Sequence, residues 1–151
     1  MNVPLVVAGT LALLGAAIHG IAGDLVVVRR LSPGKLPSSP FGGPTMTRAM
    51  IRVAWHMATV ALLTVGSALL VSGAFVHGET SRAIALVGAA ASTGIAVVVV
   101  PVAFNQARRS LAERATNPRE LRMFLHPGPA ILIAIPLLAW VGIASLERSV
   151  G

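Results

Sequence analysis

Cysteine is absent from this chain of 151 residues, and acidic residues are scarce. Without a thiol the chain forms no disulfide, thiolate nucleophile, cysteine-ligated zinc site or iron–sulfur cluster. Five Asp and Glu stand against 12 Lys and Arg, and residues of both charges make up only 11% of the sequence, while 55% is hydrophobic. Soluble domains carry about 25% charged residues, so the composition indicates a membrane protein.

Four long apolar segments account for this composition. Each is roughly 20 to 25 residues long, enough for a helix to cross about 30 Å of hydrocarbon. We therefore predict an all-α fold, an integral membrane four-helix bundle forming one domain over residues 1–151. The expected spans are 4–28, 49–73, 83–104 and 127–146. The first segment lacks the basic leader of a signal peptide, so we expect it to be retained as a span.

The basic residues gather beside two of the three connections. This pattern follows the positive-inside rule and predicts that both termini lie outside and that the first and third connections lie in the cytoplasm. The positive charge then indicates contact with anionic lipid headgroups and no nucleic-acid partner. The residues are Arg29, Arg30, Lys35, Arg48 and Arg52 at the first connection; Arg108, Arg109, Arg114, Arg119 and Arg122 at the third; and Arg82 and Arg148 on the opposite side.

The ends of two expected helices carry local start signals. Thr45 or Thr47 is the expected N-cap of the second span. In the third connection, Asn117 and Pro118 are followed by Glu120, which is typical of a helix start. We expect a short amphipathic helix there, lying at the cytoplasmic interface between spans three and four.

Ionisable side chains within the spans are the main functional signal. Gly15, His19 and Gly23 are spaced by four residues and share a helix face. Asp24 is the only acid inside an expected span. Such groups are costly in hydrocarbon and usually have a partner or a task. We expect four of them to gather in the cytoplasmic half of the bundle: His19, Asp24, His56 and His126.

The most specific hypothesis is a b-type haem used in electron transfer. His19 and His56 would be its axial ligands across antiparallel helices, with clearance from Gly15, Gly20 and Gly23. Arg48 or Arg52 would meet the propionates at the cytoplasmic side. An aromatic content of 4% offers few rings to line such a pocket.

Several alternatives stay open. His19, His56, His126 and Asp24 could hold Zn²⁺ for metal-dependent hydrolysis. The cluster could instead relay protons or ions, or bind a quinone or lipid headgroup on the Arg48, Arg52 and His56 face. An accessory subunit without a cofactor, whose histidines only bond helices together, is the non-catalytic reading. Ala- and Gly-rich surfaces also favour a homo-oligomer or docking on a larger membrane complex.

Three short motifs carry a resemblance. They are His19-Gly20-Ile21-Ala22-Gly23-Asp24, Ala54-Trp55-His56 and His126-Pro127. In this order they resemble a group of small, uncharacterised four-span bacterial membrane proteins with His-Ser-x-x-Gly-Glu, Ala-Trp-His and His-Pro elements. Here Gly20 stands in place of the serine and Asp24 in place of the glutamate. The resemblance implies a bacterial inner-membrane location and a joint role for the matched positions, and it implies no particular activity.

Overall fold

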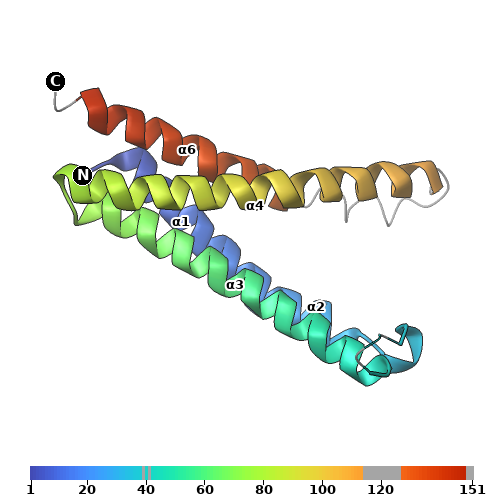
Figure 1. Cartoon of the computed structure of the whole chain (residues 1–151). Helices are drawn as coiled ribbons and strands as arrows, with labels where there is room; N and C mark the ends of the chain where they lie inside the picture. The colour runs from blue at the N-terminus through green and yellow to red at the C-terminus, as the bar shows by residue number, and fades with distance from the viewer. Residues whose placement is uncertain (39, 41, 114–126, 149–151) are drawn as a thin grey trace. The chain divides into compact units, whose positions relative to one another are not determined.

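The computed structural model describes residues 1–38, 40, 42–113 and 127–148, and this part of the chain is helical, with no β-strand (Figure 1). Four helices dominate it: α1 (Val3–Ala17), α3 (Pro44–Ala74), α4 (Gly78–Glu113) and α6 (Gly128–Arg148). Shorter helical turns follow α1: the π-helical turn η1 (Ile18–Gly23), α2 (Asp24–Val26), and 3-10 turns at Val28–Arg30 and Pro33–Lys35.

Within the described part of the chain, four helical stretches are long and apolar enough to cross a membrane, as the sequence predicted. They are Val3–Arg30, Pro44–Ala74, Gly78–Gln106 and Gly128–Arg148. Each extends past the expected span at one end or both. The expected interfacial helix and His126 fall within 114–126, outside the described residues.

The chain divides into two compact units. Unit 1 comprises Met1–Ala12 and Val65–Gly151, and unit 2 comprises Leu13–Thr64. Both α1 and α3 run through the two units. The single domain expected from the sequence therefore contains two regions with their own internal packing.

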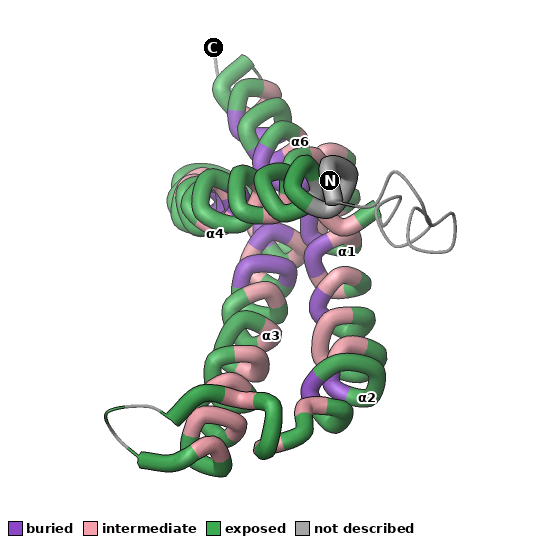
Figure 2. The backbone as a smooth tube through the Cα atoms, turned by 90° about the vertical axis from the view of Figure 1, so that its right-hand side faces the viewer, coloured by how far each residue is buried: buried purple, intermediate pink, exposed green. Residues whose placement is uncertain are grey.

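Unit 1 has a core of small and aliphatic side chains drawn from all four long helices. Leu5, Leu69 and Ala139 are fully buried there, together with Ala8, Ala12, Ala85 and Ala89 (Figure 2). At Gly9 the helices α1 and α3 touch through their backbones, because an added Cβ would lie 2.5 Å from the Leu70 amide nitrogen. Small residues that admit close backbone approach are the usual basis of helix packing in membranes.

Polar groups in unit 1 satisfy one another. The Asn2 side chain caps α1 by accepting from the Leu5 amide and donates to the Gly142 carbonyl at 2.8 Å. Ser72 and Ser81 are buried and each donates to the other's carbonyl, at 2.7 and 2.9 Å. Internal pairing of this kind is required where hydrocarbon replaces water.

Unit 2 is a hairpin. It consists of α1 from Leu13 onward, the short helical turns that follow α1, and α3 as far as Thr64. The helix α3 begins at Pro44, whose missing N–H costs nothing at a first helical position. Neither expected threonine caps it: Thr47 lies inside the helix and its hydroxyl donates to the Pro37 carbonyl at 2.9 Å. The N-cap prediction was wrong because proline, not a side-chain oxygen, sets this helix start.

Candidate functional site

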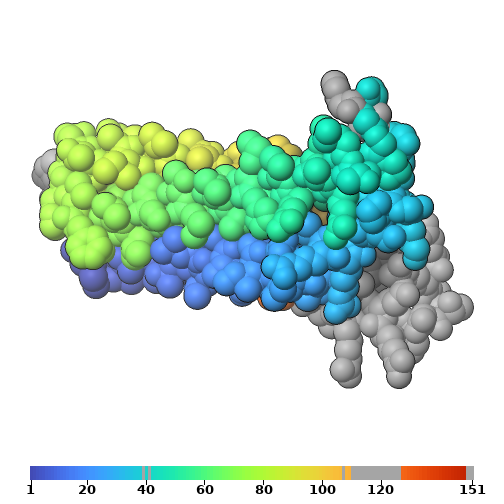
Figure 3. Space-filling view, turned by 90° about the horizontal axis from the view of Figure 1, so that it is seen from below, coloured from blue at the N-terminus to red at the C-terminus, as the bar shows by residue number. Residues whose placement is uncertain are grey.

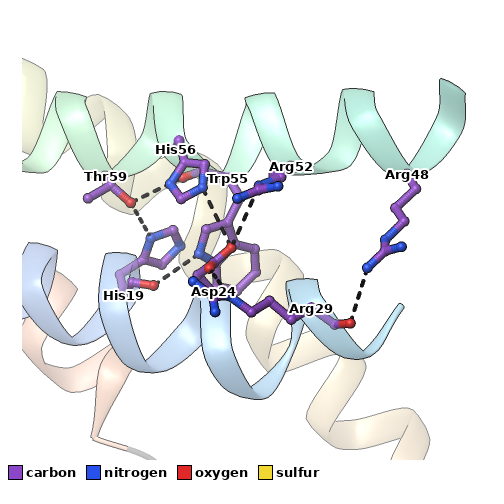
Figure 4. A network of polar contacts seen from close by, with 8 residues as sticks. All are labelled: His19, Asp24, Arg29, Arg48, Arg52, Trp55, His56 and Thr59. Atoms are coloured by element: carbon purple, nitrogen blue, oxygen red, sulfur yellow. Dashed lines mark hydrogen bonds and ion pairs between the residues drawn. The ribbon is translucent and has the colours of Figure 1, made fainter. Parts of the chain in front are cut away.

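The first feature of the site is the π-helical turn η1, where the sequence predicted an unbroken α-helix. In a π-helix each amide pairs with the carbonyl five residues back, so residues five apart come onto neighbouring positions. His19 and Asp24 have this spacing, and both lie on the side of α1–α2 that faces α3 (Figure 4). Single π turns occur frequently at functional sites. The turn is what allows an imidazole and a carboxylate on one short stretch to share a site.

His19 is held by two residues of α3. Its ring stacks on the Trp55 indole, with centroids 4.3 Å apart and an interplanar angle of 11°. Its Nδ1 lies 3.0 Å from the Thr59 hydroxyl oxygen. The Trp55 Nε1–H donates to the His19 carbonyl at 3.0 Å. Trp55 therefore contacts both the side chain and the backbone of the histidine. Figure 3 shows the segment α1–α2 (blue) lying directly against α3 (green).

The hydrogen-bond pattern assigns the tautomer of His19. The Thr59 hydroxyl donates its single hydrogen to the Trp55 carbonyl at 3.2 Å. Both contacts are hydrogen bonds at once only when this oxygen accepts from His19, which places the imidazole proton on Nδ1. The Nε2 atom of a neutral His19 is then an unprotonated acceptor. Fixing one ring nitrogen so that the other is free is how proteins prepare histidine for ligands and proton transfer.

Asp24 is the buried anion of the site, with a side chain only 8% exposed. One carboxylate oxygen, Oδ2, accepts from Arg29 Nε at 2.8 Å. The other, Oδ1, lies 3.6 Å from His56 Nε2 and 4.0 Å from Arg52 Nε. Among the described residues no group hydrogen-bonds to Oδ1, although it is fully buried. A buried acceptor without a bond is costly, so this oxygen attracts the nearest donor.

His56 is that donor by position. Its side chain is 46% exposed, and its Nε2 is the nitrogen that faces Asp24. A proton on Nε2 gives the carboxylate a favourable neighbour and leaves Nδ1 unprotonated when the ring is neutral. Asp24 is thus a positioning residue for His56, as carboxylates behind functional histidines commonly are. The site presents two imidazoles: His19, bonded through Nδ1 to Thr59, and His56, whose Nε2 faces the Asp24 carboxylate at 3.6 Å without a hydrogen bond.

The remaining predicted residues take different places. Arg52 approaches Asp24, whereas Arg48 donates to the Arg29 carbonyl at 3.2 Å and takes no part in the carboxylate cluster. The space beside Gly23 is filled by the Trp55 indole, and a Cβ at Gly20 would lie 2.7 Å from the Thr59 methyl group. Nothing lies within 4 Å of the equivalent point at Gly15, so this glycine has no contact to make in the site.

These contacts bear on the two cofactor hypotheses. The clearance expected for a porphyrin at Gly20 and Gly23 is taken up by side chains of α3, so a haem between His19 and His56 would require the two helices to move apart. For a metal, no group of three or more His, Asp or Glu side chains placed to share an ion occurs in residues 1–38, 40, 42–113 and 127–148. The fourth expected zinc ligand, His126, lies outside that part. Both cofactors remain predictions.

A groove runs along α3 beside this cluster. It is an open depression of about 580 Å³, and all of its lining residues belong to α3. Two of them, Arg52 and His56, are polar, and the other four are apolar: Val53, Met57, Val60 and Ala61. This side of α3 therefore places two hydrogen-bond donors beside an apolar surface.

Three residues of the site were not predicted: Arg29, Trp55 as a ring partner, and Thr59. Arg29 was interpreted only as one of the basic residues beside the first connection, and Trp55 only as part of the Ala54-Trp55-His56 motif. The available signal was spacing, because Arg52, Trp55, His56 and Thr59 lie within two helical turns of one another. Nothing in the sequence indicates the π turn. The sequence therefore does not show which residues after α1 face these four.

Comparisons of the chain with protein-family models, with curated proteins and with solved structures gave no match. The resemblance to small four-span bacterial membrane proteins therefore stays a prediction. The function has to be argued from the geometry of unit 2. Its chemistry consists of two oriented imidazoles, a shielded carboxylate, exposed arginine and an apolar groove.

Proposed function

We propose that the protein is a multi-pass protein of a bacterial inner membrane that binds an amphipathic ligand drawn from the bilayer. The polar head of the ligand is held by Arg52 and His56, and its apolar part lies in the groove along α3. The observation that carries this proposal is that groove, in which the two polar residues share one surface with four apolar ones. Ligand sites are typically apolar, with a few convergent polar groups.

The residues around the groove have distinct roles in this proposal. Arg52, with a side chain 61% exposed, and His56 supply donors to the ligand head. Asp24 orients His56 and is shielded from the ligand, because its free oxygen is buried. Trp55 and Thr59 fix His19 and hold α1 against α3, which keeps the carboxylate in place.

Native mass spectrometry of the detergent-purified protein tests this function. We expect the wild type to retain amphiphiles that Ala61→Phe loses, because the added ring fills the groove. The matched control is Ala58→Phe, an exposed alanine one turn away that does not line the groove. Equal retention by both variants and the wild type would refute binding in the groove.

The orientation in the membrane is part of the same proposal. Both termini lie outside, the connections after spans one and three lie in the cytoplasm, and the amphipathic helix of the third connection lies at the cytoplasmic interface. The distribution of basic residues supports this arrangement. The groove then opens in the cytoplasmic leaflet, since Arg48 and Arg52 mark that boundary.

The cysteine-free chain makes the orientation simple to test with single substitutions. A membrane-impermeant thiol reagent applied to intact cells should label Thr80→Cys, in the exposed first turn of α4 beside the second connection, and leave Ser38→Cys in the first connection unlabelled. Permeabilised cells provide the control, in which both positions react. Labelling of Ser38→Cys alone in intact cells would show that the orientation is the opposite of the one proposed.

A further inference from the structure

Unit 2 is strongly basic on its outside. It contains five basic residues (Arg29, Arg30, Lys35, Arg48 and Arg52) and one acid, Asp24. The acid is buried and already paired with Arg29. The surface that unit 2 presents to a ligand therefore carries an excess of positive charge, all of it between residues 29 and 52.

The character of the exposed side chains changes along α3. Arg48, Arg52 and His56 are spaced by four residues and so share a face. The apolar residues of the groove begin at Val53, on the strip beside this face, and extend past His56 to Ala61. Cations therefore come first along the helix, the imidazole lies beside the start of the apolar strip, and only apolar groups reach the far end. An anionic phospholipid has the complementary order of phosphate, glycerol ester and acyl chain.

The length of this face also matches. From Arg48 to Ala61 the helix advances by roughly 20 Å at 1.5 Å per residue. One leaflet of a bilayer, including its headgroups, is half of about 40 to 45 Å, which is the same length. A phospholipid of the cytoplasmic leaflet could thus contact the whole face without leaving its own layer.

We infer that the ligand of the groove is an anionic phospholipid, with its phosphate against Arg48 and Arg52 and an acyl chain along Val53, Met57, Val60 and Ala61. This rests on the proposed function and names the class of ligand. A neutral quinone would use the groove and His56 but gain little from Arg48. A zwitterionic lipid would bring its own cation toward the arginines. Guanidinium groups suit phosphate because they offer several donors in a planar fork.

Competition between two photoreactive lipids tests the inference on the unmodified protein. Nanodiscs would contain equal amounts of phosphatidylglycerol and phosphatidylcholine, with a diazirine in the acyl chain of one lipid or the other. We expect peptides containing residues 53–61 to be crosslinked at least about fivefold more by the glycerol lipid, since one Lys or Arg near the surface contributes about this factor.

A pair of double variants locates the selectivity. Arg48→Gln with Arg52→Gln should bring crosslinking by phosphatidylglycerol down to the level of phosphatidylcholine. Arg30→Gln with Lys35→Gln removes the same charge from unit 2 but off the α3 face, and should keep the preference. If the two double variants lose it equally, general surface attraction explains the binding and the inference is wrong.

The outcomes separate this inference from the proposed function. Equal crosslinking of residues 53–61 by both lipids overturns the anionic preference and leaves groove binding intact. Preferential displacement of both lipids by an added short-chain quinone identifies a neutral ligand and also overturns it. Crosslinks confined to other segments of the chain overturn both proposals.

Discussion

Units 1 and 2 share the helices α1 and α3, to which unit 1 adds α4 and α6, yet their polar groups are arranged in opposite ways. In unit 1 the buried serines 72 and 81 bond reciprocally, and Asn2 has both a donor and an acceptor partner. In unit 2 a buried carboxylate oxygen has no hydrogen bond, and an arginine and a histidine stand exposed beside it. The arrangement in unit 1 joins helices to one another, whereas the arrangement in unit 2 leaves polar groups able to bind a ligand.

Small residues differ in the same way between the two units. In unit 1, glycine at position 9 lets backbones touch, and fully buried alanines complete the core. In unit 2, the glycines at 20 and 23 make room for the threonine and tryptophan side chains that position His19. Small residues therefore serve packing in one unit and the placement of polar groups in the other.

The largest effect is expected for Gly9→Ala compared with Gly15→Ala on the same helix. The new methyl at position 9 would meet the α3 backbone at 2.5 to 2.9 Å, and backbone atoms cannot rotate aside. We expect a loss of about 2 kcal/mol, within the usual range for overpacking. Position 15 has open space, so alanine there should stabilise the protein by about 0.5 to 1 kcal/mol through the lost backbone freedom of glycine. Unfolding in SDS, followed by circular dichroism, measures both. Equal effects would show that close packing does not distinguish unit 1.

A smaller effect is expected for Ser72→Ala in unit 1. The substitution leaves the buried Ser81 carbonyl without the Ser72 hydroxyl that donates to it, at a cost of roughly 1 to 2 kcal/mol, while the Ser81 hydroxyl keeps its bond to the carbonyl of residue 72. Thr64→Ala is the control, because that exposed hydroxyl only donates to the Val60 carbonyl of its own helix. The same unfolding assay applies. If Thr64→Ala proves as damaging as Ser72→Ala, internal pairing is not what stabilises unit 1.

The smallest effect is expected for Trp55→Phe in unit 2. Phenylalanine keeps a ring over His19 but removes the indole N–H that donates to the His19 carbonyl. Side-chain hydrogen bonds between membrane helices average about 0.6 kcal/mol, so stability should fall by roughly that amount. Amide hydrogen exchange should increase in residues 18–24 and stay constant in the Ser72–Ser81 turn. Uniform exchange changes in both units would contradict an independent site.

The sequence predicted much of the fold because membrane spans depend on a coarse property, the length of apolar runs. It also predicted that His19, Asp24, His56 and His126 gather, because ionisable residues in a span require partners. The first three do lie between α1–α2 and α3, and His126 lies outside the described residues. The sequence did not predict the π turn, since a change from i+4 to i+5 pairing depends on the partner helix as well as on local residues. Without that turn, His19 and Asp24 point about 140° apart on an α-helix, so their common facing toward α3 could not be derived.

The glycines show a second limit. A Gly15, His19 and Gly23 stripe indicates free volume on one helix, but the sequence does not say what fills it. At Gly23 the occupant is Trp55, a residue of the same hairpin rather than a cofactor. The prediction of space for a porphyrin followed from the missing glycine side chains alone. It could not include the Trp55 ring on the opposite helix, which fills the space at Gly23.

We expect the two histidines of unit 2 to adopt opposite tautomers, His19 because Nδ1 bonds to Thr59 and His56 because its Nε2 faces the Asp24 carboxylate at 3.6 Å. Solid-state NMR of protein labelled with ¹⁵N-histidine, in bilayers at mildly alkaline pH, reads the tautomers directly. We expect the proton on Nδ1 in His19 and on Nε2 in His56, with Asp24→Asn changing the His56 signals and sparing those of His19. A proton on Nε2 in His19, together with His56 signals indifferent to Asp24→Asn, would contradict the account.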